Sequence, residues 1–243
     1  MFNIVKAELY KNTRRPLLYL LTAVCAAVVT LLNSTFYFNH TLRESAIPSM
    51  LSLSYVGLLF IVLFADLVLA EELRFGTLKN TVSFGAARGS IYGGRLVSAS
   101  ILYLAYFAAI SLVFWATSCL FMPAGPGFNG QFIANFLLRA AATLTTRLSA
   151  LSLALFLALL LKRNATLIFA FLGAMLLPAG LLLYLSPQGQ VFSQLLSMTL
   201  IVQSTMVGRT AIENMGVIML TSAVRFAVFA AAGMLVFHRQ EVN

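Results

Sequence analysis

The chain has 243 residues, of which 60% are apolar and 9% are charged, and its formal net charge is +9. A soluble domain is typically about 45–50% apolar and about 25% charged, so this composition excludes a soluble globular protein and a disordered one. An integral membrane protein remains. Since a spanning helix takes about 20 residues, the length accommodates about six spans and no large additional domain.

The first 15 residues predict an amphipathic helix that lies in the cytoplasmic membrane interface. Apolar side chains recur at helical spacing: Phe2, Val5 and Leu9. Polar side chains occupy the other side: Lys6, Glu8, Lys11 and Asn12. A solvated tail with chance periodicity is the alternative.

Six apolar stretches then predict membrane-spanning helices. They are Pro16–Phe38, Pro48–Ala70, Leu96–Met122, Phe136–Leu161, Ala165–Leu185 and Met215–Phe237. None alternates polar and apolar residues as the strands of a membrane barrel do, which favours an all-α fold. The first stretch is longer than the 7–15 apolar residues of a signal peptide, so we expect an uncleaved span.

The basic residues give the orientation of these spans. Two of the 16 lie in segments on one side of the predicted membrane, Arg43 and Arg209, and three lie within spans. The other eleven lie on the opposite side: Lys6, Lys11, Arg14, Arg15, Arg74, Lys79, Arg88, Arg95, Lys162, Arg163 and Arg239. Because cytoplasmic loops carry the excess of Lys and Arg, both termini are expected in the cytoplasm.

Two of the connecting segments are long. The cytoplasmic loop 71–95 is rich in charge, whereas the outer segment 186–214 mixes apolar residues with Gln and Ser. That mixture is too polar for a seventh span, and it predicts a short helix or a re-entrant hairpin in the outer leaflet.

Motifs for catalysis are absent from the sequence. There is no Gly-x-x-x-x-Gly-Lys-Ser/Thr phosphate loop and no Gly-x-Ser-x-Gly elbow, so we expect no enzymatic activity of the chain itself. The two Cys and two His have no metal-ligand spacing, which predicts no metal site and no directly bound cofactor. The positive charge marks membrane topology and does not indicate a nucleic-acid partner.

The loop 71–95 has the features of a docking element. It begins with Glu71 and Glu72, turns at Gly76-Thr77 and then offers a short apolar face of Leu78, Val82 and Phe84, followed by Arg88. A short helix parallel to the membrane and rimmed by charges could enter a groove of a cytoplasmic partner. An ordinary basic loop is the alternative.

This pattern resembles the first cytoplasmic loop of type-2 ABC exporter permeases. The family has an acidic residue, Gly-Thr, a short apolar helix, a Ser, an Arg and a basic residue at the next span. These places are taken here by Glu72, Gly76-Thr77, Ser83, Arg88 and Arg95. The N-terminal helix, the six spans and the outer segment are similar to the family as well. A Pro that often follows the Ser is replaced by Gly85-Ala86, and a frequent Lys is replaced by Arg95; both changes keep the turn and the charge.

The resemblance implies a permease in a bacterial plasma membrane that pairs with a second copy or a sister permease. Two copies of a separate ATPase subunit would bind ATP and Mg and push on a coupling helix around Leu78–Phe84. The residues implied in that contact are Glu71, Glu72, Arg74, Gly76, Thr77, Leu78, Val82, Phe84 and Arg88. The cargo implied is an amphipathic peptide, an antibiotic or a lipid-like molecule, moved outward. A membrane anchor or sensor subunit and an ion-coupled transporter are the alternatives.

Four charged residues fall within the predicted spans: Asp66, Arg139, Arg147 and Arg225. Each costs about 2.5–3.5 kcal/mol on insertion scales, which makes each a candidate functional residue. Arg139 can extend to the outer interface. Arg147 and Arg225 lie deeper, and they either pair with Asp66, bind carbonyls at span ends, or line a polar route.

Overall fold

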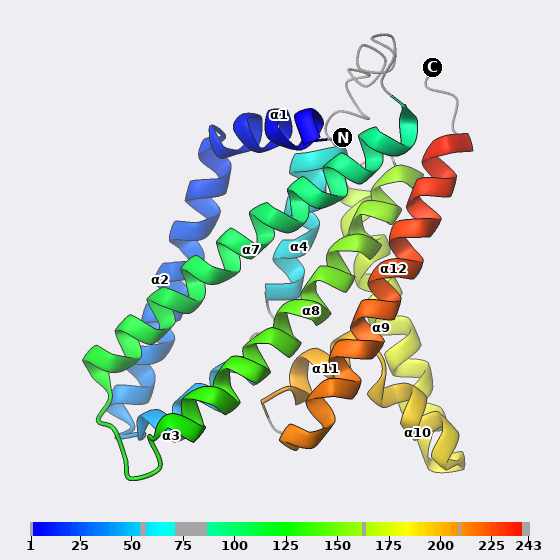
Figure 1. Ribbon diagram of the computed structural model, residues 1–243. Helices are drawn as coiled ribbons and strands as arrows, with labels where there is room; N and C mark the ends of the chain where they lie inside the picture. The colour runs from blue at the N-terminus through cyan, green and yellow to red at the C-terminus, as the bar shows by residue number, and fades with distance from the viewer. Residues whose placement is uncertain (1, 54–56, 71–86, 162–163, 209, 240–243) are drawn as a thin grey trace.

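In the computed structural model, residues 2–53, 57–70, 87–161, 164–208 and 210–239 are described. Every regular element among these residues is a helix, which confirms the all-α prediction (Figure 1). Five helices are long and apolar enough to cross a membrane: Pro16–Phe38, Arg88–Phe121, Gly130–Leu160, Ala165–Gln188 and Ile212–Arg239. The chain is therefore built as a multi-pass membrane protein.

Different helices lie at the two ends of the bundle. Helix α1 (Phe2–Thr13) lies across one end, where the C-terminal end of α12 (Met215–Arg239) also lies (Figure 1). The opposite end carries two short helices, α10 (Gln190–Ser197) and α11 (Leu200–Met206). For residues 186–214 the sequence predicted a short helix or a re-entrant hairpin, and the structure has short helices there.

The long helices largely agree with the predicted spans, and two of them begin earlier than predicted. α2 (Pro16–Phe38) and α9 (Asn164–Leu185) lie where the first and fifth spans were predicted. α8 (Gly130–Leu160) begins earlier than predicted, at an Asn129 cap whose side chain accepts a hydrogen bond from the Phe132 amide at 2.9 Å. α7 (Arg88–Phe121) also begins earlier, so Arg88 and Arg95 belong to a helix and not to a loop.

The stretch Pro48–Ala70, predicted as a single second span, contains parts of more than one helical element. α3 (Arg43–Leu53) begins before it and lies at the end opposite α1 (Figure 1). α4 (Gly57–Ala65) continues into the π-helix η2 (Asp66–Ala70), and the apolar helix here spans only Phe60–Leu69. One continuous span over Pro48–Ala70 is therefore not confirmed, and residues 54–56 within it lie outside the described residues.

Helix α8 forms the centre of the bundle. It packs on α12 along much of its length and also contacts α4, α7 and α9. Its interior face carries small side chains with no exposed surface, namely Ala142, Ala150, Ala154 and Ala158. In membranes, small residues allow helix backbones to approach closely, and they account for this central position.

Polar contacts at the end opposite α1 connect α2, α3 and α7. Asn33 of α2 is fully buried, and its amide donates to Thr117 Oγ1 at 2.5 Å and Ser118 Oγ at 3.2 Å. Arg43 of α3 donates to the carbonyls of Cys119 and Met122, where α7 ends, at 3.1 and 2.8 Å. The loop after α7 is thereby fixed to α3.

Candidate functional site

The predicted coupling loop falls almost wholly outside the described residues. Its implied contact residues there are Glu71, Glu72, Arg74, Gly76, Thr77, Leu78, Val82 and Phe84. The elements that flank it are described, however: η2 ends at Ala70 and α7 begins at Arg88. The candidate site therefore consists of the residues that bind these two helix ends to the rest of the bundle.

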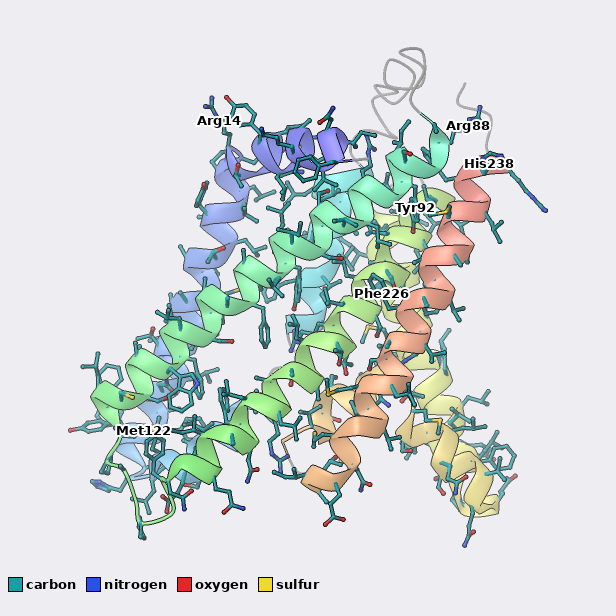
Figure 2. The ribbon with its side chains drawn as sticks, in the orientation of Figure 1. Arg14, Arg88, Tyr92, Met122, Phe226 and His238 are labelled. Atoms are coloured by element: carbon teal, nitrogen blue, oxygen red, sulfur yellow. The ribbon has the colours of Figure 1, made fainter. Side chains whose placement is uncertain are left out.

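Arg88 fixes the start of α7 to the end of α12. Its Nη1 donates to the His238 carbonyl at 3.0 Å, and the two residues lie together at the end of the bundle (Figure 2). One turn further on, the ring of Tyr92 lies on Phe237 with centroids 6.1 Å apart and presses against Gly233. The start of α7 is thus bonded to, and packed against, the end of α12.

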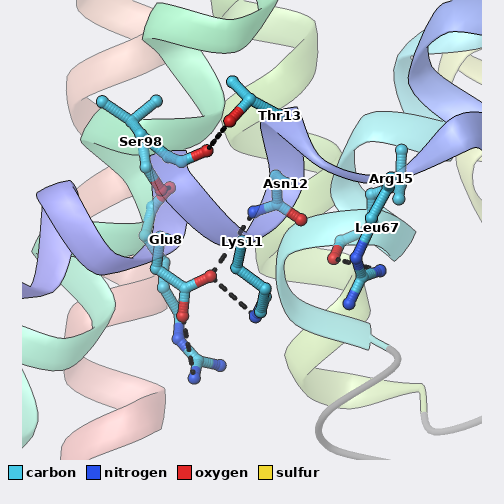
Figure 3. A network of polar contacts seen from close by, with 9 residues as sticks. Glu8, Lys11, Asn12, Thr13, Arg15, Leu67 and Ser98 are labelled. Atoms are coloured by element: carbon cyan, nitrogen blue, oxygen red, sulfur yellow. Dashed lines mark hydrogen bonds and ion pairs between the residues drawn. The ribbon is translucent and has the colours of Figure 1, made fainter.

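Glu8 joins α1 to α7. Its carboxylate accepts from Lys11 Nζ at 2.8 Å and from the Asn12 amide at 3.4 Å, and it forms an ion pair with Arg95 Nη2 at 3.5 Å (Figure 3). Glu8 is 8% exposed and Arg95 is 2% exposed. A carboxylate shared by two cations and an amide is a buried polar junction, and losing one member leaves a buried charge.

Arg15 joins the same region to the π-helix η2. Its Nη1 donates to the Leu67 carbonyl of η2 at 3.3 Å (Figure 3). A π-helix widens the turn and is common at functional sites. The chain between α1 and α2 is thus tied to the helix that leads into the loop, while α1 is tied to the helix that follows it.

The sequence pattern misassigned two residues of this junction. Glu8 and Asn12 were expected on the polar, solvated side of α1, yet both are buried together with Val5. Phe2, expected on the apolar face with Val5, is 80% exposed. The protein-facing side of α1 therefore combines apolar residues with Glu8, whose ion-pair partner Arg95 lies on that side. The sequence signal was a single acidic residue in an otherwise basic segment.

Arg225 binds the outer segment to α12. Its guanidinium donates to the Met198 carbonyl at 2.9 Å, to Gln203 Oε1 and to Ser222 Oγ at 3.1 Å. The Gln203 amide donates in turn to Thr221 Oγ1 at 2.9 Å. Sequence reasoning did not single out Gln203, although an amide in a semi-apolar segment facing a spanning arginine is a possible signal.

Arg139 and Arg225 bind equivalent positions of two helices. Arg139 Nη1 donates to the carbonyl of Val207, the C-cap of α11, and Met198 is the C-cap of α10. Carbonyls at a helix C-terminus have no partner within the helix and carry partial negative charge. For Arg225 this geometry matches the carbonyl-binding alternative, whereas extension of Arg139 to the outer interface stays a prediction.

Arg147 lies in the core and contacts another helix. It is 3% exposed, and its Nη1 donates to the Tyr103 hydroxyl of α7 at 3.3 Å. The guanidinium lies over Gly57, where an added Cβ would come within 3.1 Å of Cζ. The pairing of Asp66 with Arg147 or Arg225 stays a prediction.

Five arginines share one mode of binding within the described part of the chain. Each donates to a backbone carbonyl at or near the end of another helical element: Arg15, Arg43, Arg88, Arg139 and Arg225. The guanidinium suits this role because it keeps its charge and offers five donors in a planar fork. In a chain with 16 basic and 7 acidic residues, carbonyls supply acceptors that carboxylates cannot.

Within the described ranges, no group of three or more His, Cys, Asp or Glu side chains is placed so that it could hold a metal ion. Comparison of the sequence with known protein families and with curated proteins found no match. The functional proposal therefore depends on two features of the structure. They are the geometry of the helix ends that flank residues 71–86 and the contacts of the arginines.

Proposed function

We propose that this chain is the transmembrane subunit of an ATP-driven exporter of the type-2 ABC permease kind, powered by a separate ATPase. One observation supports the proposal: α1 and the N-cap residue of α2 that follows it are bonded to the two helices that flank the predicted coupling loop. Glu8 holds Arg95 of α7, and Arg15 holds the Leu67 carbonyl of η2. A force applied to the loop reaches α1, α2, α7 and, through Arg88, α12.

The proposed assembly contains two ATPase subunits, which bind ATP and Mg, and a second permease copy or a sister permease. Six crossings, with α4 and η2 as the second, give both termini a cytoplasmic location in a bacterial plasma membrane. The contact residues proposed on the loop remain those implied by the resemblance, centred on Leu78–Phe84. The outer segment is proposed to dip into the outer leaflet.

The cargo is proposed from the resemblance alone as an amphipathic peptide, an antibiotic or a lipid-like molecule. Comparison of export by membranes that contain the chain and its ATPase, with and without ATP, tests each class in turn.

Two alternatives have distinct signatures. An anchor or sensor subunit holds a cytoplasmic partner through the same loop and moves no cargo. An ion-coupled transporter uses Asp66 and the buried arginines, and its flux follows the proton gradient and ignores ATP. The donation of Arg139 and Arg225 to helix-end carbonyls gives these two residues a structural role, which favours the ATP-driven proposal.

Co-purification is the decisive experiment. We expect the chain, extracted from its native membranes, to bring down an ATP-binding subunit and to raise its rate of hydrolysis. A chain that purifies alone, with no associated ATPase in native membranes, contradicts the proposal.

Charge reversal at Glu72, or a bulky residue at Gly76, tests the loop itself. We expect either change to leave insertion intact and to uncouple hydrolysis from transport. Charge reversal at Glu213, an exposed acid at the opposite end, is the matched control. Normal transport by both loop variants removes the coupling role.

A further inference from the structure

The exposed face of α1 carries a regular row of aromatic and cationic residues. Phe2, Lys6 and Tyr10 follow one another at every fourth position along one side of the helix, Arg14 follows Tyr10 in the turn that ends the helix, and all four are exposed. We call these four residues the outer row of α1. The row lies opposite the buried stripe of Val5, Glu8 and Asn12.

The outer row has cations but no anion of its own. Glu8 is the only acidic residue of α1, and it is buried against Arg95 and Lys11. Among the described residues, no carboxylate forms an ion pair with Lys6 or Arg14. The Arg14 guanidinium lies 4.3 Å from the centroid of the Tyr10 ring, at the outer corner where α1 meets α2 (Figure 2). The row therefore presents positive charge outward.

The outer row continues into the lateral surface of α2. The hydroxyl of Tyr19 donates to the Thr13 carbonyl at 2.6 Å, which joins the end of α1 to the first turns of α2. From there the exposed side chains of α2 are apolar: Leu17, Leu20, Val24, Val28 and Leu31. An apolar lateral surface of this kind faces hydrocarbon, so the row lies where the hydrocarbon ends and the head groups begin.

We propose that the outer row of α1 binds the head groups of anionic phospholipids. Lys6 and Arg14 supply donors and positive charge for phosphodiester oxygens, and Phe2 and Tyr10 insert between head groups and acyl chains. The exposed fractions of Phe2 and Tyr10, 80% and 60%, favour a lipid surface over an acidic segment of a protein. The inference goes beyond the transport function and does not depend on it.

Lipid competition on the full-length chain tests this proposal. The purified chain in neutral detergent is offered equal amounts of phosphatidylglycerol and phosphatidylcholine, and the bound lipids are counted by native mass spectrometry. Each cation near an anionic lipid contributes about fivefold in binding, so the Lys6→Gln/Arg14→Gln variant is expected to lose about 25-fold of the preference for phosphatidylglycerol.

Two matched variants keep the result interpretable. Lys6→Arg/Arg14→Lys keeps both charges and is expected to keep the preference. Arg239→Gln removes an exposed cation from the same end of the bundle, and it is expected to leave the preference unchanged. Tyr10→Ser is expected to weaken binding of both lipids alike, since the ring does not distinguish their charges. Unfolding temperatures equal to wild type verify that the variants are folded.

Three results overturn the proposal. The first is an unchanged preference in Lys6→Gln/Arg14→Gln. The second is an equal loss in Arg239→Gln, which makes the effect one of net charge. The third is displacement of phosphatidylglycerol by a soluble polyglutamate peptide at a concentration below that of the lipid. That result assigns the row to an acidic protein partner.

Discussion

Replacement of Arg225 by Met is expected to release α11 while leaving the bundle folded. Arg225 makes two contacts with the outer segment, one to the Met198 carbonyl at 2.9 Å and one to Gln203 Oε1. Hydrogen bonds to charged groups each contribute about 1.5–3 kcal/mol. Because the side chain is partly exposed, we take the lower end of the summed range, about 3 kcal/mol, as the cost of opening residues 198–206, which contain Met198 and α11.

Hydrogen exchange measures this opening directly. At about 1.4 kcal/mol for each factor of ten, amides of Leu200–Met206 should exchange roughly 100-fold faster in Arg225→Met than in wild type. Amides of Ala150–Leu155 in the buried centre of α8 provide the internal reference and should not change. The same measurement in Arg239→Gln controls for the loss of one positive charge.

Arg225→Lys separates geometry from charge. An ammonium group keeps the charge but lacks the planar fork that reaches Met198 and Gln203 together, so exchange of α11 should fall between those of wild type and Arg225→Met. Unchanged exchange in Arg225→Met refutes the anchoring role. Wild-type exchange in Arg225→Lys refutes the need for the guanidinium and leaves charge alone as the cause.

Three further predictions concern stability, measured as thermal unfolding in detergent. Glu8→Ala should lower the free energy of unfolding by about 3 kcal/mol, because it leaves Arg95 buried without this carboxylate. The double variant Glu8→Ala/Arg95→Met should recover most of that free energy. A double variant as unstable as Glu8→Ala alone contradicts the ion pair. Gly233→Ala should lower the free energy of unfolding by about 1–3 kcal/mol, because the added Cβ meets the ring of Tyr92. Tyr92→Phe should leave it unchanged or raise it, because the buried hydroxyl has no hydrogen-bond partner among the described residues. Asn33→Leu should cost about 1–3 kcal/mol, and a neutral result would show that its bonds to α7 contribute little.

The sequence predicted the long helices well because apolar length is a local property. α2 and α9 begin and end within a residue of the predicted spans, since polar or turn residues border them on both sides. The stretch 43–70 was harder. Its helix α3 begins at Arg43 and its last turns form a π-helix, and neither feature follows from hydropathy. Helix irregularities depend on packing partners that are distant in the sequence.

The helical wheel of α1 failed for a related reason. A wheel assigns polar residues to water, but Glu8 has an ion-pair partner in a helix that begins more than 70 residues later. A buried carboxylate is stable only with such a partner, and periodicity within 12 residues contains no information about it. Sequence alone could note the isolated acid and could not locate Arg95 beside it.

The contacts of the arginines were the least predictable feature, because their acceptors are backbone carbonyls. A carboxylate partner such as Asp66 can be sought in a sequence, whereas every residue has a carbonyl and only the fold decides which ones lack an intrahelical partner. Met198 and Val207 qualify because α10 and α11 end there. A short helix leaves as many unpaired carbonyls as a long one, so breaking the outer segment into two helices doubles the number of C-termini that need a donor. Arg225 and Arg139 supply those donors from spanning helices, and this explains why a chain with few acidic residues has arginines inside its spans.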